Sequence, residues 1–146
     1  MIEKLKEQYK MAHYGWHYSI QRIDLLMISI SGAGIYVCLE AMKYSFENSL
    51  GGTSAIKIAG LFFVVAIVLN FISQFTGMKA NQLDMLMSED KLDCNNEPDE
   101  LTRERINNLK CSIKVCNTWT FYLNTSSMAV MFIGLIVILK YFWFTF

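Results

Sequence analysis

Polar or small residues recur along one side of an otherwise apolar segment near the middle of the 146-residue chain. They follow one another at steps of four, three, four and three residues, a spacing that brings them to one face of an α-helix. This polar stripe consists of Asn70, Gln74, Gly77, Asn81 and Asp84. Amide groups are unfavourable against lipid, so the stripe is expected either to hydrogen-bond to another helix or to line an aqueous pore. The sequence leaves both interpretations open.

A second set of residues has the chemistry to hold phosphate. This basic line consists of Arg103, Asn107, Lys110 and Lys114, again at helical steps, with Arg105 beside them. Positioned cations bind phosphate with salt-sensitive affinity, which predicts a nucleotide or oligonucleotide regulator. The same cations also suit the basic bias of cytoplasmic segments and contact with anionic lipid headgroups.

Residue types that bind metals or catalyse reactions do not form a complete site by motif. His13 and His17 are four residues apart, but no third ligand is near, and hydrogen bonding at the membrane interface accounts for them. Cys111 and Cys116 have an unsuitable spacing for a zinc knuckle, and the acidic run 89–100 lacks the glycine of a calcium loop. HExxH, GxSxG and P-loop patterns are also absent from the sequence. We therefore expect no metal, no cofactor and no enzymatic activity.

The composition indicates that a lipid bilayer surrounds the helices that carry these residues. The chain is 53% hydrophobic and only 18% charged, which is outside the usual balance of a soluble domain. Three long apolar stretches predict transmembrane helices at 24–43, 55–76 and 119–142. Aromatic residues flank the third span, with Trp119 at one end and Trp143 at the other. The predicted fold class is an all-α membrane protein with three transmembrane helices.

The distribution of basic residues predicts the orientation. Ten of the thirteen Lys and Arg residues lie before the first span or in the segment 77–118. The positive-inside rule therefore places the N-terminus and segment 77–118 in the cytoplasm. The loop 44–54 and the C-terminal residues 143–146 are then external, which agrees with the alternation of three spans.

Two further helical segments are expected on the cytoplasmic side. Pro98, followed by Asp99 and Glu100, is typical of a helix start, so segment 77–118 is predicted to be a helical hairpin that extends the second and third spans. Segment 1–23 reads as an amphipathic helix that packs on this hairpin, on a neighbouring subunit or in the headgroup layer. Its apolar residues are Ile2, Leu5, Tyr9, Ala12, Trp16 and Ile20.

A conduit would require several copies of the chain. Three spans enclose little volume for a solute, whereas in a closed ring the same polar stripe from every subunit would converge on the axis. The partners expected from the residues are therefore the lipid bilayer, further copies of the chain in a homo-oligomer, and a nucleotide regulator.

Two stretches of the sequence resemble a known kind of protein. The N-terminal segment EKLKEQYKMAHYGWHYSIQRID, and the segment NFISQFTGMKANQLDMLMSEDKLD that continues the second span, look like those of the SLATT-type membrane effectors of bacterial nucleotide-linked conflict systems. Size and plan are also similar to the transmembrane effectors of Hailong antiphage systems. The third span, Trp119 to Phe142, departs from a two-span pattern. The resemblance implies a channel-like effector of the bacterial inner membrane, controlled by a nucleotide signal from a nucleotidyltransferase partner.

The leading hypothesis is a homo-oligomeric inner-membrane pore gated through its cytoplasmic helices by a nucleotide signal in antiphage defence. The alternative is a non-conducting scaffold or accessory subunit, in which the polar stripe packs against another protein and the hairpin docks a cytoplasmic partner.

Overall fold

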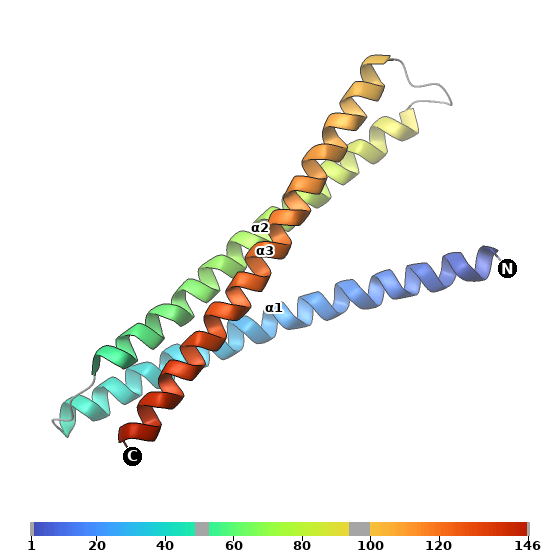
Figure 1. The fold of residues 1–146 in the computed structure, drawn as a ribbon. Helices are drawn as coiled ribbons and strands as arrows, with labels where there is room; N and C mark the ends of the chain where they lie inside the picture. The colour runs from blue at the N-terminus through green and yellow to red at the C-terminus, as the bar shows by residue number, and fades with distance from the viewer. Residues whose placement is uncertain (1, 49–52, 94–99, 146) are drawn as a thin grey trace. The chain divides into compact units, whose positions relative to one another are not determined.

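The computed structural model is built from three long helices (Figure 1). Helix α1 runs from Ile2–Glu47, α2 from Thr53–Asp93 and α3 from Glu100–Thr145. The structure describes the backbone of residues 2–48, 53–93 and 100–145, and the side-chain environment of 21–48, 53–91 and 100–145. Every described residue except Asn48 is helical, which confirms the predicted all-α class for this part of the chain.

Each of the three helices is long and apolar enough to cross a membrane. The apolar spans lie within Gln21–Glu47, Thr53–Lys91 and Glu100–Thr145. The prediction of three transmembrane helices is confirmed at this level, and the chain is a multi-pass membrane protein by length and composition. At 1.5 Å per residue a helix of 46 residues is about 69 Å long, roughly twice what a bilayer core of about 30 Å requires.

The helices continue through positions where the sequence suggested boundaries. Helix α1 passes without interruption from the predicted N-terminal segment into the first span, because the one proline of the chain, Pro98, lies elsewhere. The ends of the predicted external loop 44–54 are also helical, since α1 reaches Glu47 and α2 starts at Thr53. Pro98 itself lies outside the described residues, and the described part of α3 starts two residues later, at Glu100.

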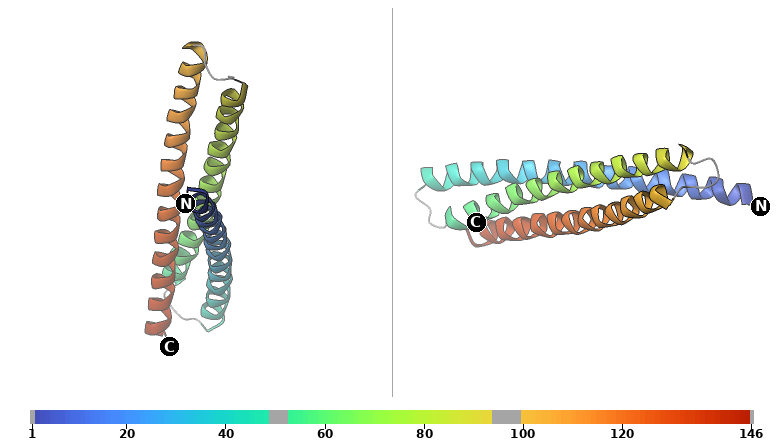
Figure 2. Two further views of the ribbon diagram at one scale, coloured as in Figure 1. Left: turned by 90° about the vertical axis from the view of Figure 1, so that its right-hand side faces the viewer. Right: turned by 90° about the horizontal axis from the view of Figure 1, so that it is seen from above.

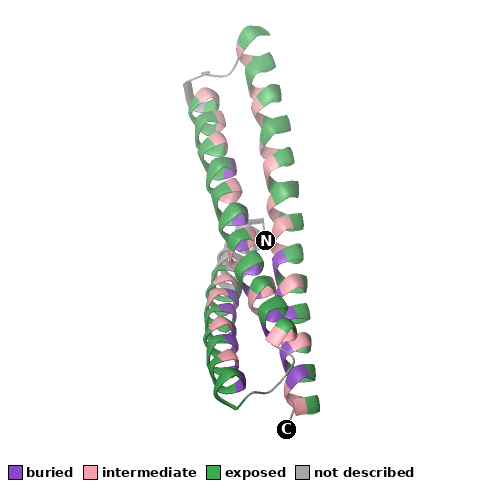
Figure 3. Ribbon diagram, turned by 90° about the vertical axis from the view of Figure 1, so that its left-hand side faces the viewer, coloured by how far each residue is buried: buried purple, intermediate pink, exposed green. Residues whose placement is uncertain are grey.

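The chain divides into two compact units, and α2 and α3 contribute to both. The three-helix unit comprises Met1–Ile67 and Met131–Phe146, and the hairpin unit comprises Val68–Val130. Buried residues follow one side of each helix, as the purple segments in Figure 3 show. Most of each helix surface is therefore left for lipid or for other protein.

The core of the three-helix unit centres on Phe63 of α2, which is completely buried. A glycine of each neighbouring helix lies against its ring: a Cβ atom at Gly34 of α1 would be 2.6 Å from the ring, and one at Gly134 of α3 would be 3.2 Å from it. A Cβ atom at Gly60 of α2 would lie 3.7 Å from Cβ of Cys38 on α1, an ordinary contact distance. Small residues thus allow three helices to approach one another closely, as is typical of packing within membranes.

The hairpin unit consists of α2 from Val68 onward and α3 up to Val130, which run antiparallel. Ser73 pairs with Thr120 and Asp90 pairs with Arg105, so positions further along α2 meet positions earlier on α3. Figure 2 shows the two helices side by side in both further views. In this part of α3 the partly or fully buried residues include a set that recurs every seven residues, Ile106, Ile113, Thr120 and Ser127, and a second set between them, Thr102, Leu109 and Cys116. A seven-residue repeat of this kind is typical of coiled-coil packing.

Candidate functional site

Hydrogen-bonding side chains connect α2 and α3 within the predicted spans. Asn70 and Ser73 of α2 are buried, with 1% and 0% of their surface exposed. The Ser73 hydroxyl donates to the backbone carbonyl of Thr120 at 3.0 Å, and the Asn70 side-chain amide donates to Asn124 Oδ1 at 3.5 Å. The first bond has ordinary geometry and the second is long, and therefore weaker. These contacts form a polar seam between the two helices.

Gln74 links this seam to the outer surface of the hairpin. Its Nε2 donates to Asn70 Oδ1 at 2.9 Å, while the residue itself is exposed. Within the described residues, no hydrogen-bond partner is found for Gln74 Oε1. Gln74, an exposed amide residue, thus lies one helical turn after the buried Asn70, within the predicted second span at 55–76.

The structure divides the predicted polar stripe into two groups. Asn70 lies in the seam, and Gly77 faces α3, because a Cβ atom there would be 3.6 Å from Thr120 Cγ2. Gln74, Asn81 and Asp84 are exposed on the flank of α2. The five residues therefore lie on one broad side of α2, but only Asn70 and Gly77 of them face α3.

Sequence reasoning missed the residues that complete the α2 side of the seam. Ser73 and Ala80 are buried, at 0% and 2% exposure, and Met87 continues their seven-residue spacing with partial burial. On the opposite helix, Thr120 and Ser127 share the same spacing. A search for a seven-residue repeat of small and apolar residues, in place of a search for polar ones, would have found this line.

The basic line lies on the exposed surface of α3 in the hairpin unit. Arg103, Arg105, Asn107, Lys110 and Lys114 are all exposed. Arg105 Nε lies 3.0 Å from Asp90 Oδ2 on α2, so this cation also ties the two arms of the hairpin together. The other four side chains project from one helix without converging on a single enclosed cavity.

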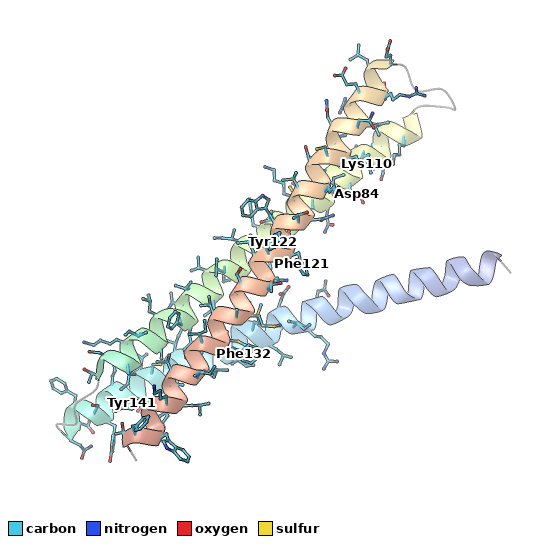
Figure 4. All side chains as sticks on the ribbon, in the orientation of Figure 1. Asp84, Lys110, Phe121, Tyr122, Phe132 and Tyr141 are labelled. Atoms are coloured by element: carbon cyan, nitrogen blue, oxygen red, sulfur yellow. The ribbon has the colours of Figure 1, made fainter. Side chains whose placement is uncertain are left out.

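Lys110 and Lys114 line a shallow depression on α3 that continues toward the aromatic end of the predicted third span. Figure 4 shows Lys110, Phe121 and Tyr122 in order along this helix. The lining residues are Lys110, Ile113, Lys114, Asn117, Thr118, Phe121 and Tyr122. Cations, polar groups and aromatic rings thus follow one another along one helix surface.

The remaining candidates for metal binding do not converge in the described part of the chain. Among those residues, His, Cys, Asp and Glu form no group of three or more that could hold a metal ion. Cys38, Cys111 and Cys116 have free thiols. The side chains of His13 and His17, like Cys94, lie outside the residues whose environment is described.

Comparisons with protein-family models, with curated proteins and with solved structures give no match to this chain.

Proposed function

We propose that the chain is the subunit of a homo-oligomeric membrane pore, in which the exposed flank of α2 lines the aqueous path. In this proposal the membrane is the bacterial inner membrane, and the N-terminal part of α1 and the hairpin around residues 77–118 lie in the cytoplasm. The hairpin controls opening in response to a nucleotide signal, as the resemblance to SLATT-type effectors implies.

The observation that carries the proposal is the exposed amide of Gln74. Its nitrogen donates to Asn70 Oδ1, whereas no hydrogen-bond partner for its oxygen is found among the described residues. A lipid tail cannot satisfy that oxygen, whereas water in a pore or a donor from another subunit can. Asn81 and Asp84 continue the exposed polar surface along the same helix, beyond the predicted end of the span.

The small buried fraction of the spans supports assembly into an oligomer. In the most apolar part of each helix, only 22% to 28% of the residues are buried within one copy of the chain. The unburied surface is available to lipid and to further copies. A ring of identical subunits would repeat Gln74 around its axis, because cyclic symmetry brings the same residue of every copy to the same depth.

The exposed and the buried members of the polar stripe are tested by different measurements: ion flux for Gln74 and stability for Asn70. Gln74→Leu should change ion flux through proteoliposomes. Because it also removes the hydrogen bond to the buried Asn70, its stability is measured as well, and flux is compared at equal amounts of folded protein. Asn70→Leu should instead lower the stability of the hairpin, by about 1 kcal/mol or more, because it removes a buried hydrogen-bonding group. Phe71→Leu is the matched control, since Phe71 is exposed on the same helix and carries no polar group. If wild type conducts and Gln74→Leu conducts identically, Gln74 does not line the path.

A non-conducting accessory subunit is the second candidate, and the burial of Asn70 favours it. Its side-chain amide is bonded inside the chain to Asn124 and Gln74, so packing alone explains the most buried member of the stripe. The mass of the detergent-solubilised protein discriminates between the candidates. A defined homo-oligomer that conducts ions supports the pore, and a silent monomer that becomes stable only with a second protein supports the accessory subunit.

The proposed regulator is a nucleotide or oligonucleotide that binds the distal part of the basic line, made by a nucleotidyltransferase partner. The exposed side chains of Arg103 and Asn107 supply a cation and an amide for phosphate, and Arg105 adds a second cation whose charge is shared with Asp90. Arg103→Gln should weaken the binding of a labelled cyclic dinucleotide and reduce its salt dependence, whereas Lys79→Gln on α2 should not. Equal loss in both variants would indicate nonspecific charge attraction.

A further inference from the structure

We infer that the depression on α3 between Lys110 and Tyr122 is a binding site for one anionic phospholipid, with the headgroup phosphate at the two lysines and the upper acyl chain against the aromatic rings. This lipid site is separate from the proposed pore function and does not depend on it. It assigns Lys110 and Lys114 to lipid and leaves Arg103, Arg105 and Asn107 to the proposed nucleotide.

The two lysines are positioned to act on one phosphate group. They are four residues apart on an uninterrupted helix, which places them on the same face about 6 Å apart along its axis. Both are exposed, and neither makes an ion pair with a described carboxylate. Two long cationic side chains that border one depression can therefore reach the same anion.

The middle of the depression carries neutral hydrogen-bonding groups. Asn117 is exposed and has an amide that can donate to a phosphate or ester oxygen. The Thr118 hydroxyl donates to the carbonyl of Lys114 at 2.9 Å, so its oxygen is oriented as an acceptor on this surface. This zone lies about 4.5 to 6 Å beyond Lys114 along the helix, the next helical turn.

Aromatic rings form the far end of the depression. Phe121 and Tyr122 are 67% and 63% exposed, and their rings meet edge to face with centroids 6.0 Å apart. Such rings suit the boundary between headgroups and hydrocarbon. The order of charge, hydrogen-bonding group and aromatic surface along α3 is the order of phosphate, ester and acyl chain in a phospholipid.

That polarity gradient selects a lipid over a soluble anion as the occupant. Free inorganic phosphate would leave Phe121 and Tyr122 uncovered, and a zwitterionic lipid would give the two lysines less net attraction than an anionic one. The apolar segment 119–142 also begins at this level of α3, so the lysines border the zone where headgroups of an adjacent leaflet lie.

Fluorescence quenching of Trp119 tests the site, because Trp119 is exposed and directly follows Thr118. The full-length chain with Trp16→Phe and Trp143→Phe, which leaves Trp119 as the one tryptophan, is reconstituted into liposomes. Quenching by phosphatidylglycerol with brominated acyl chains is compared with quenching by the matching brominated phosphatidylcholine. We expect a preference for the anionic lipid of about fivefold for each lysine that contacts it.

Lys110→Gln with Lys114→Gln should reduce that preference to about one. The matched control, Lys79→Gln with Lys91→Gln, removes the same charge from exposed positions on α2 and should keep it. Circular dichroism and elution volume confirm that each variant is folded. An absent preference in the wild type, or an equal loss in the control pair, overturns the site in favour of general surface attraction. Displacement of the anionic lipid by millimolar inorganic phosphate or ATP also overturns it, in favour of a soluble phosphate ligand.

Discussion

Replacement of Gly34 by alanine should destabilise the three-helix unit, whereas the same replacement at Gly32 should not. The added Cβ atom at Gly34 would lie 2.6 Å from Cε2 and Cζ of Phe63, against about 3.5 to 4.0 Å for a favourable carbon contact. The ring must therefore move by about 1 Å. Its room to move is small, because Phe63 is completely buried and its opposite edge lies close to Gly134.

The magnitude follows from the comparison of the two glycines. Overpacking a buried site costs about 1 to 3 kcal/mol, while alanine in a helix is favoured over glycine by roughly 1 kcal/mol. A Cβ atom at Gly32 meets nothing within 4 Å, so only the second effect operates there. The helix preference cancels in the difference, which leaves Gly34→Ala less stable than Gly32→Ala by about 1 to 3 kcal/mol.

The assay is reversible unfolding of the purified protein, transferred from a mild detergent into increasing sodium dodecyl sulfate and followed by circular dichroism. A double-mutant cycle with Phe63→Leu gives the sharper result, because leucine lacks the ring atoms that the new Cβ atom approaches. Gly34→Ala should cost much less in that background than in wild type. Equal stability of Gly32→Ala and Gly34→Ala, or full additivity in the cycle, would show that the helices do not pack around Phe63 as described.

Three further changes test separate contacts. Ser73→Ala should lower stability in the same unfolding assay by roughly 0.6 kcal/mol, since it removes the hydrogen bond to the Thr120 carbonyl; no change would mean that the bond contributes nothing. Arg105→Gln should cost less than about 1 kcal/mol, because the Arg105 side chain is 64% exposed in its pair with Asp90, and the difference from wild type should disappear in roughly 1 M salt. A variant with Cys111 as its one cysteine should react with a membrane-impermeant maleimide only from the cytoplasmic side of inner-membrane vesicles; reaction only from the other side would reverse the proposed orientation.

Composition and charge spacing were sufficient to predict the three long helices. Long apolar stretches without proline can satisfy their backbone groups in lipid only as continuous helices, so this part of the fold depends on local properties. The relation between the amphipathic segment 1–23 and the first span at 24–43 was not specified by the sequence. No residue there breaks a helix, and α1 extends from Ile2 through Glu47, so the change from polar to apolar composition does not mark a structural boundary.

The site was predicted less completely, because polarity alone does not determine which side of a helix faces its partner. Asn81 and Asp84 share the periodicity of Asn70 but are exposed. Ala80 is buried in their place, since a small apolar side chain allows close approach of α3 and an amide or carboxylate would need a buried partner. That preference depends on the neighbouring helix, which a single sequence does not specify.

The residues that form the contact between α2 and α3 change from polar to apolar along the hairpin unit. This is the change expected if the two helices pass from lipid into water, as proposed. Where the hairpin unit overlaps the predicted spans its buried residues are polar: Asn70 and Ser73 on α2 and Ser127 on α3. In the extension beyond the spans the least exposed residues are mainly apolar, as at Leu83 on α2 and Leu109 and Ile113 on α3.

Lipid provides no hydrophobic drive between helices, so close packing, as around Phe63, and hydrogen bonds hold them together there. Water does provide that drive, so aliphatic side chains suffice where the helices leave the bilayer. The contact residues of α3 therefore predict that the membrane surface lies near Cys116 to Thr120. The apolar contact residues end there and the polar contact residues begin. This boundary lies at the level of Trp119, the aromatic residue at which the predicted apolar span begins. A membrane surface at this level of the hairpin, as proposed above, would account for both changes.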